Sequence, residues 1–138
     1  MAKVRYAEED DEEPIAGLEQ EWMSEGISKD TTAYTREEIR EATKDKRILV
    51  AEEEAVVGFI FFRFREDYCE LDTIYVAKRH RGKKIGEKLM EKFLSLRKVR
   101  DCEKIYLSAD SIHEERLMNF YSKFGFEKVA IEMGKKQK

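Results

Sequence analysis

The stretch Tyr75-Val-Ala-Lys-Arg-His-Arg-Gly-Lys-Lys-Ile-Gly86 decides the fold of this chain of 138 residues. It joins an expected strand that ends at Val76 to an expected helix that begins near Lys83, through a loop with five Lys/Arg residues and one His. Helix N-termini present N–H groups without partners and the positive end of the helix dipole, so they bind anions. Because Arg81, Lys83 and Lys84 lie beside this helix start, the stretch predicts an anion site suited to a pyrophosphate.

Two glycines in this loop have separate expected roles. Gly82 is expected to let the backbone approach the anion, and Gly86 to let the first helical turn pack closely. The spacing GxxxxGK[ST] of a P-loop is absent. A nucleic-acid patch is the alternative interpretation, with Tyr68 and Tyr75 available for stacking. The net charge of −3 and the lack of an RNA-binding signature argue against nucleic acid as a partner.

Working outward, the hydrophobic pattern predicts alternating strands and helices without internal repeats. We expect strands over residues 4–7, 48–51, 56–64, 69–76, 105–109 and 126–133, and helices over 12–25, 35–43, 84–99 and 113–124. Thr35-Arg-Glu-Glu38 is a capping box, and Glu52–Glu54 is expected to be a turn. The order predicts an α/β (α+β) fold with a mixed sheet of about six strands and helices on both faces. At this length we expect one domain over residues 1–138.

Composition excludes several classes of protein. No apolar run approaches the roughly 20 residues of a membrane span. The start of the chain lacks the apolar stretch of a signal peptide, so we expect a cytoplasmic protein. Cys69 and Cys102 are far apart, with two His residues elsewhere, so we expect reduced thiols and no metal site. Many Lys and Glu with one Asn and two Gln favour a thermophilic source as a hypothesis.

Charge and apolar residues are unevenly distributed. Residues 1–45 contain 14 Asp+Glu and 6 Lys+Arg, whereas the remaining 93 residues contain 16 and 21. Two regions of opposite charge could face a cationic and an anionic ligand, or could simply be solvated surface. The apolar run Phe59–Phe64 is expected to be buried on both faces of the sheet or at a homodimer contact.

Two motifs resemble one known family. Arg81-Gly-Lys-Lys-Ile-Gly86, between a strand and an amphipathic helix, resembles the acetyl-CoA motif [Q/R]-x-x-G-x-[G/A] of the GNAT family of N-acetyltransferases. About 35 residues later, Asn119-Phe-Tyr-Ser-Lys-Phe-Gly-Phe126 resembles the second motif of that family. The resemblance covers nearly the whole chain. It implies a GNAT-like fold, acetyl-CoA as co-substrate and direct transfer of the acetyl group to a primary amine of a small molecule or peptide.

The resemblance also implies the residues of a cofactor site. In this chain they are Ile74, Tyr75, Val76, Arg81, Gly82, Lys83, Lys84, Ile85, Gly86, Asn119 and Tyr121. Backbone N–H groups around Ile74–Val76 would hold the thioester oxyanion. Tyr121 would protonate the departing CoA thiolate. The alternative is that Tyr121 belongs to an aromatic stripe made only for packing.

The reaction requires a base. An alkyl amine of pKa near 10.4 costs roughly 4.6 kcal/mol to deprotonate at pH 7. Glu70 matches the catalytic Glu of histone-type family members, and Asp72, of the same parity, is the second candidate. Both could instead be polar strand-edge residues. The acidic first third favours a cationic acceptor, such as a polyamine, a lysine side chain or a protein N-terminus, with Tyr34 as a substrate contact in the loop 26–34.

This chain departs from the family pattern in two places. Lys84 stands where the motif has its first Gly, which costs about 1–2 kcal/mol if the position has a positive φ and little if it is helical. Only 12 residues follow Phe126, enough for one strand where many family members have two. One wall of the acceptor site would then be short, open or completed by a partner chain. A regulator that binds acetyl-CoA without catalysis is the alternative function.

Overall fold

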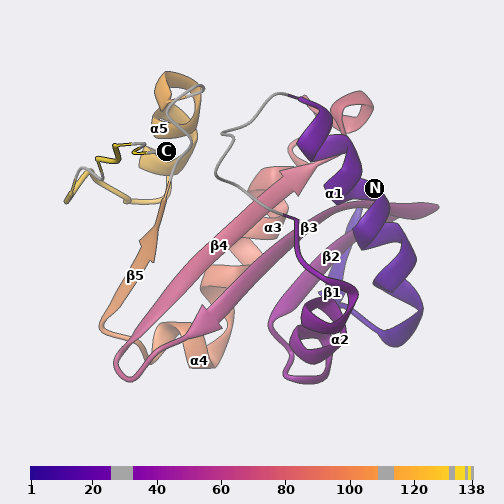
Figure 1. The fold of residues 1–138 in the computed structure, drawn as a ribbon, viewed down its shortest axis with the longest axis horizontal. Coiled ribbons are helices and arrows are strands. Elements are labelled where there is room, and N and C mark those ends of the chain that lie inside the picture. The colour runs from indigo at the N-terminus through magenta and orange to yellow at the C-terminus, as the bar shows by residue number, and fades with distance from the viewer. Residues whose placement is uncertain (26–32, 109–113, 131–132, 136, 138) are drawn as a thin grey trace. The chain divides into compact units, whose positions relative to one another are not determined.

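The computed structural model describes residues 1–25, 33–108, 114–130, 133–135 and 137 (Figure 1). The chain separates into two compact units, residues 1–108 and 109–138, and each is described by itself. The first unit contains strands β1 Lys3–Tyr6, β2 Ile48–Glu53, β3 Ala55–Phe64, β4 Tyr68–Val76 and β5 Lys104–Leu107, with helices α1 Glu12–Ser24, α2 Arg36–Lys44, α3 Ile85–Ser95 and α4 Arg97–Arg100. Two short 3₁₀ helices, η1 Glu9–Asp11 and η2 Lys78–His80, complete it, and the second unit contains helix α5 Glu114–Ser122.

The sheet is mixed, as predicted. Its strands follow the order β1-β2-β3-β4-β5, with antiparallel pairs up to β4 and a parallel pair between β4 and β5. The parallel pair requires a crossover, which η2, α3 and α4 supply. Among the described residues the sheet has five strands, against about six expected.

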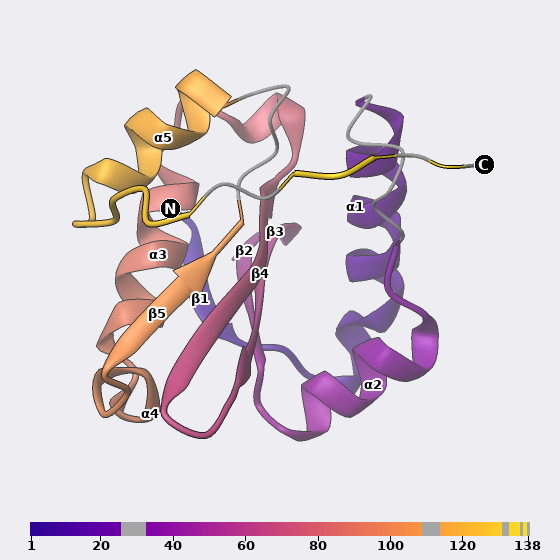
Figure 2. The same cartoon turned by 60° about the vertical axis from the view of Figure 1, so that its left-hand side comes forward.

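Helices cover both faces of the sheet (Figure 2). Ile15 and Leu18 of α1 and Ile39 of α2 pack with Phe59 and Phe61 of β3 in one buried cluster. On the other face, the ring of Phe62 lies 5.0 Å from that of Phe93 in α3. The run Phe59–Phe62 is therefore buried on both faces within one chain, as one of the two expectations held.

Local signals explain where the helices begin and end. At the start of α2 the hydroxyl of Thr35 accepts the Glu38 N–H at 3.0 Å, and the Glu38 carboxylate accepts the Thr35 N–H at 2.9 Å, which confirms the capping box. The helix expected over 84–99 is divided, because Leu96 is extended (ψ 132°) and separates α3 from α4.

One expected strand is wrong, and parts of three other expected segments fall outside the described residues. The strand expected over 126–133 is absent from residues 126–130 and 133, which the structure describes without regular structure. Residues 109 and 113, which bound an expected strand and helix, and 26–32 of the expected substrate loop lie outside the described residues. None of the helices described is long and apolar enough to cross a membrane.

Gly58 of β3 is expected to be intolerant of a side chain. An added Cβ would lie 2.9 Å from the Tyr75 carbonyl oxygen on β4. Gly58→Ala should therefore lower the free energy of unfolding by about 1–3 kcal/mol, because backbone cannot move aside easily. Urea denaturation measures the change.

Gly17→Ala is the matched control for this substitution. Gly17 lies inside α1, and a Cβ there meets nothing within 4 Å. Alanine should raise stability by about 0.5–1 kcal/mol at this position. Equal effects of the two substitutions would contradict the close approach of β3 and β4.

Candidate active site

The basic loop has the backbone of an anion site. Gly82 has φ 84°, a left-handed conformation that glycine adopts without strain, and no atom lies within 4 Å of where its Cβ would be. The helix that follows begins at Ile85 behind Lys84, whose side chain makes no capping hydrogen bond. The first turn of α3 thus presents N–H groups that no N-cap side chain satisfies, at the positive end of the helix dipole.

Lys84 also adopts the left-handed conformation, with φ 63° and ψ 23°. The cost expected for a lysine with a positive φ therefore applies here, because the glycine of the family motif would be unstrained at this position. Its side chain is exposed, and no ion pair of Lys84 is found in the described part of the chain. Strain and an additional positive charge therefore occur at the same position.

Two other cations of the loop, Lys83 and Arg81, have partners. The Lys83 ammonium lies 3.9 Å from the Glu53 carboxylate and 3.4 Å from Nδ1 of His80. Arg81 forms a two-bond ion pair with Glu25, at 2.9 and 2.8 Å. The sequence expectation placed Arg81 on the cofactor, whereas its guanidinium here contacts the end of α1.

Strand β4 contains one residue more than its partner. Phe61 pairs with Thr73 while Phe62 pairs with Leu71, so Asp72 is an extra residue opposite β3. A bulge of this kind bends the strand and turns consecutive side chains to one face. The β4–β5 ladder ends at the same point, because its last pair is Leu71 with Leu107. Beyond the bulge, residues 72–76 of β4 therefore have no ladder partner on β5.

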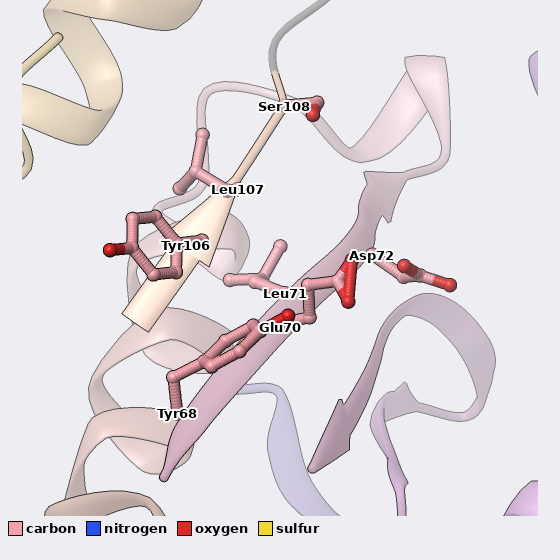
Figure 3. A pocket seen from close by; sticks show the side chains of 7 residues that line it. All are labelled: Tyr68, Glu70, Leu71, Asp72, Tyr106, Leu107 and Ser108. Carbon is pink, nitrogen blue, oxygen red and sulfur yellow. The ribbon is translucent and has the colours of Figure 1, made fainter. Parts of the chain in front are cut away.

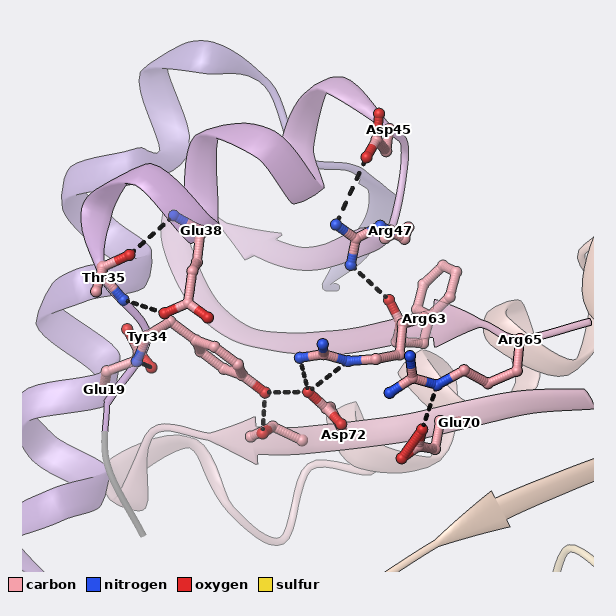
Figure 4. A network of polar contacts seen from close by, with 12 residues as sticks. Glu19, Tyr34, Thr35, Glu38, Asp45, Arg47, Arg63, Arg65, Glu70 and Asp72 are labelled. Atoms are coloured by element: carbon pink, nitrogen blue, oxygen red, sulfur yellow. Dashed lines mark hydrogen bonds and ion pairs between the residues drawn. The ribbon is translucent and has the colours of Figure 1, made fainter.

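The bulge places Asp72 in a polar network with residues of β3, β4 and the segment before α2 (Figure 4). Two N–H groups of Arg63 donate to Oδ2 of Asp72, at 2.5 and 3.1 Å. The hydroxyl of Tyr34 lies 3.1 Å from the same oxygen and 2.7 Å from the hydroxyl of Thr73. Since burial raises the pKa of Tyr34, the phenol keeps its proton at neutral pH.

Tyr34 is held at two further points. Its ring stacks on that of Phe61 with 4.0 Å between the centroids. Its N–H donates to the carboxylate of Glu19 at 2.9 Å, and Glu19 is 1% exposed. The residue expected to contact the substrate is thus joined to Asp72, one of the two expected bases.

A pocket of about 340 Å³ opens where β4 and β5 separate (Figure 3). Seven residues of the two strands line it, namely Tyr68, Glu70, Leu71, Asp72, Tyr106, Leu107 and Ser108. The rings of Tyr68 and Tyr106 meet edge to face, 5.2 Å apart. Glu70 and Asp72, the two expected bases, therefore line one pocket. Glu70 faces it from the regular part of β4, and Asp72 faces it from the bulge.

Glu70 has fewer hydrogen-bond partners than Asp72. Nε of Arg65 donates to it at 2.9 Å, and both side chains are substantially exposed. Each carboxylate of the pocket thus has an arginine partner from β3 or the turn that follows it. No cluster of His, Cys, Asp or Glu able to hold a metal ion is found among the described residues.

Tyr121 and Asn119 lie on α5 in the second unit. Tyr121 is 6% exposed, and its ring lies edge to face with those of Phe120 and Phe126. Burial raises the pKa of Tyr121 to about 12. Asn119 is exposed. The packing expected for the aromatic stripe is present, and the hydroxyl keeps its proton at neutral pH.

Several residues of the site were not foreseen from the sequence. They are Glu25, Arg63, Arg65, Thr73, Tyr106 and Ser108. Arg63 and Arg65 follow the apolar run of β3 with the spacing of one strand face, which is a weak signal. The pairing of Glu25 with Arg81, 56 residues away, has no local signal.

The sequence matches the Acetyltransferase (GNAT) family over residues 6–126. The chain belongs to the GNAT family. This confirms the family expected from the two motifs, and with it the GNAT-like fold. No curated protein sequence matches the chain.

Solved structures of similar fold include other acetyltransferases. Ard1 from Thermoplasma volcanium has a TM-score of 0.76 and 24% identity, covering 94% of this chain and 84% of that one. N-acetylglutamate synthase from Neisseria gonorrhoeae, complexed with coenzyme A and N-acetyl-glutamate, has a TM-score of 0.75 and 17% identity, covering 94% of this chain and 29% of that one. An aminoglycoside acetyltransferase from an uncultured soil sample, in complex with sisomicin, has a TM-score of 0.71 and 15% identity, covering 99% and 97%. Identities of this size show the GNAT fold alone.

Replacing Lys84 with glycine should stabilise this GNAT protein. Glycine adopts φ 63° without the steric cost of a side chain, so Lys84→Gly is expected to raise the free energy of unfolding by about 0.5–1 kcal/mol. Lys84→Ala keeps the strain and should bring no gain. Thermal and urea unfolding distinguish the two variants; a loss of stability in Lys84→Gly would mean that the lysine side chain stabilises the helix start.

The stability of the site should depend on pH through Glu19. Burial raises the pKa of Glu19, so the folded protein holds this proton more tightly than the unfolded chain does. The resulting contribution to the free energy of unfolding is fully present below the usual pKa of Glu, and it is lost as the pH rises through the raised pKa of the folded state. Glu19→Gln keeps an acceptor for the Tyr34 N–H without the buried charge. It should therefore raise the free energy of unfolding more at pH 7 than at pH 4.

The exposed Glu41 on α2 provides the control for this comparison. Glu41→Gln is expected to change stability by similar small amounts at both pH values. Urea unfolding of both variants at pH 4 and pH 7 tests the idea, and a Glu19→Gln effect that does not vary with pH would refute it.

Proposed function

We propose that this GNAT protein is an N-acetyltransferase that transfers the acetyl group of acetyl-CoA directly to a primary amine. The observation that supports this most is the divergence of β4 and β5 at the Asp72 bulge, directly before a glycine-containing basic loop and an uncapped helix start. This arrangement offers an anion site at one end of β4 and a pocket with two carboxylates along it.

The cofactor would be held by the loop and by the open part of β4. The N–H groups at the start of α3, near Ile85 and Gly86, suit pyrophosphate oxygens, and Lys83 and Lys84 add positive charge. Gly82 leaves space for the phosphates to approach. Backbone N–H groups around Ile74–Val76, beyond the end of the β5 ladder, are proposed to hold the thioester oxyanion.

Glu70 is proposed as the base. It lines the pocket, and its single arginine partner is largely exposed. Asp72 accepts hydrogen bonds from both Arg63 and Tyr34 and is therefore proposed to position Tyr34 and not to remove a proton. A carboxylate that takes a proton from the attacking amine, directly or through water, contributes about 10²–10⁴ in rate.

Tyr121 is proposed as the partner of the leaving group. Its phenol keeps its proton at neutral pH because burial raises its pKa to about 12. The O–H can hydrogen-bond to the developing CoA thiolate and pass it a proton as the C–S bond breaks. The cationic amine loses two protons on its way to the amide. One leaves through Glu70 to water, and the other, released from nitrogen as the C–N bond forms, replaces the proton that Tyr121 gave to the thiolate, so the transfer ends with CoA thiol, a neutral amide and one released proton.

The acceptor is proposed to be a single amine, such as a lysine side chain or a protein N-terminus. Sequence charge favoured any cationic amine, polyamines included. Glu25, which precedes the segment expected to face the acceptor, is paired with Arg81 from outside the acidic first third. The pocket carboxylates also have arginine partners. The carboxylates that line the pocket are therefore balanced by arginines, which favours an acceptor with one amine over a polycation.

Calorimetric titration of acetyl-CoA into the protein tests the cofactor site. Wild type should bind with a Kd of about 10 μM or less. A Lys83→Ala/Lys84→Gly variant removes both charges, keeps the left-handed conformation at position 84, and should bind about tenfold more weakly. No binding at about 0.1 mM acetyl-CoA would refute the proposed function.

Release of CoA thiol with lysine peptides, N-terminal peptides and polyamines tests the chemistry. Glu70→Gln should lower kcat about 10²-fold without changing the Kd of acetyl-CoA. Glu66→Gln in the exposed β3–β4 turn is the matched control and should leave kcat unchanged. Tight binding without thiol release on any amine would favour the non-catalytic regulator instead.

A further inference from the structure

Three of the five N–H donors of Arg81 are used inside the protein, one from each nitrogen of its guanidinium. Its Nη1 and Nη2 donate to the two carboxylate oxygens of Glu25 at 2.9 and 2.8 Å, and its Nε donates to the Val76 carbonyl at 3.1 Å. Fork-to-fork pairs of this kind fix orientation as well as charge. The end of the guanidinium that carries Nη1 and Nη2 therefore faces Glu25.

Tyr75 completes this cluster from β4. Its ring lies under the Arg81 guanidinium, 5.3 Å from the ring centroid, and its hydroxyl donates to the Glu25 carboxylate. Tyr75 is 5% exposed. The Arg81 hydrogen bonds lower the pKa of Glu25, so the carboxylate is charged at neutral pH. Glu25, Tyr75 and Arg81 are referred to below as the Glu25 cluster.

The Glu25 cluster connects two parts of the proposed site. Glu25 directly follows α1 and precedes the segment expected to face the acceptor. Tyr75 and Val76 form the end of β4, where the thioester is proposed to lie, and Arg81 belongs to the cofactor loop. A second bond joins the same parts, because the Lys78 N–H donates to the Glu21 carboxylate at 3.2 Å.

We infer that Glu25 is a positioning residue, which holds Arg81 and the end of β4 in the geometry that binds acetyl-CoA and so makes cofactor binding depend on the end of α1. This rests on the proposed function. Arg81 acts through the loop and β4, and the phosphate charge is met by Lys83, Lys84 and the start of α3.

Positioning and simple charge predict opposite effects of removing Glu25. A negative charge beside an anion site repels the cofactor, so a through-space effect alone would make Glu25→Gln bind acetyl-CoA more tightly. Positioning predicts weaker binding, by about fivefold or more. Arg81→Gln should weaken binding by a similar factor, and the Glu25→Gln/Arg81→Gln variant should be no weaker than the poorer single variant, because one shared contact is lost only once.

Glu53→Gln is the matched control. Glu53 also lies beside the loop, with its carboxylate 3.9 Å from the Lys83 ammonium, and has no contact with Arg81. Removing its charge should tighten acetyl-CoA binding by less than about twofold. Tyr75→Phe keeps the ring under the guanidinium, loses only the hydroxyl, and should show an intermediate loss with little risk to folding.

Isothermal titration calorimetry with acetyl-CoA on these variants, each checked by thermal unfolding, measures the effect. At saturating substrates kcat should stay within about threefold of wild type while KM for acetyl-CoA rises, since Glu25 positions the groups that bind the cofactor. Additive losses in the double variant, or Glu25→Gln binding as tightly as Glu53→Gln, would overturn the inference with the proposed function intact. Absence of binding by wild type would overturn both.

Discussion

The geometry of the site depends on Asp72, the residue of β4 that has no pairing partner on β3. Up to Leu71 the strand is held on both sides, by Phe62 of β3 and by Leu107 of β5. After the extra residue, the described part of the chain pairs this strand with β3 alone. A bulge increases the local twist, so β4 leaves β5 without losing its register on the rest of the sheet. The pocket, the end of the β5 ladder and the polar network of Tyr34 all lie at this one irregularity.

The second constraint is the start of α3. The chain must turn from the end of β4 into a helix within a few residues, and it does so through two left-handed positions, Gly82 and Lys84. A lysine in this conformation has a steric strain that glycine would lack, and it places an ammonium group next to the helix N-terminus. Strain of this kind persists where the surrounding structure enforces it. Here the buried Ile85 and Leu89 fix the helix on the sheet directly after the turn.

The sequence allowed most of the first unit to be predicted, because its signals are local. Apolar runs rich in β-branched and aromatic residues predicted the central strands, the capping box at Thr35 predicted the start of α2, and the glycine-containing loop marked the N-terminus of α3. Helix 84–99 was predicted too long, since an extended Leu96 in an otherwise helical pattern leaves no trace in the spacing. The strand expected at 126–133 rested on apolar residues alone, and the described residues of that segment are largely exposed.

The partners within the site could not be predicted in the same way. Register across a sheet is a property of two strands, so the extra residue at Asp72 is invisible in one of them. Parity correctly grouped Glu70 with Asp72 but could not show that Thr73 shares their face. The pairs of Asp72 with Arg63 and of Arg81 with Glu25 depend on which segments the fold brings together. Sequence charge likewise counted carboxylates whose arginine partners only the fold reveals.

The double-sided burial of β3 has a consequence for the chain before it folds. Residues 56–62 form an uncharged segment rich in aromatic and β-branched side chains and free of proline, which is the composition of an aggregation-prone strand. Until both helical layers are in place, this segment is exposed to other chains. Charged residues bound it closely, with Glu52–Glu54 before it and Arg63, Arg65 and Glu66 after it, in the manner of gatekeepers that oppose intermolecular pairing. Arg63 and Arg65 therefore serve the protein twice, first by keeping nascent chains apart and then by pairing with the carboxylates of the pocket.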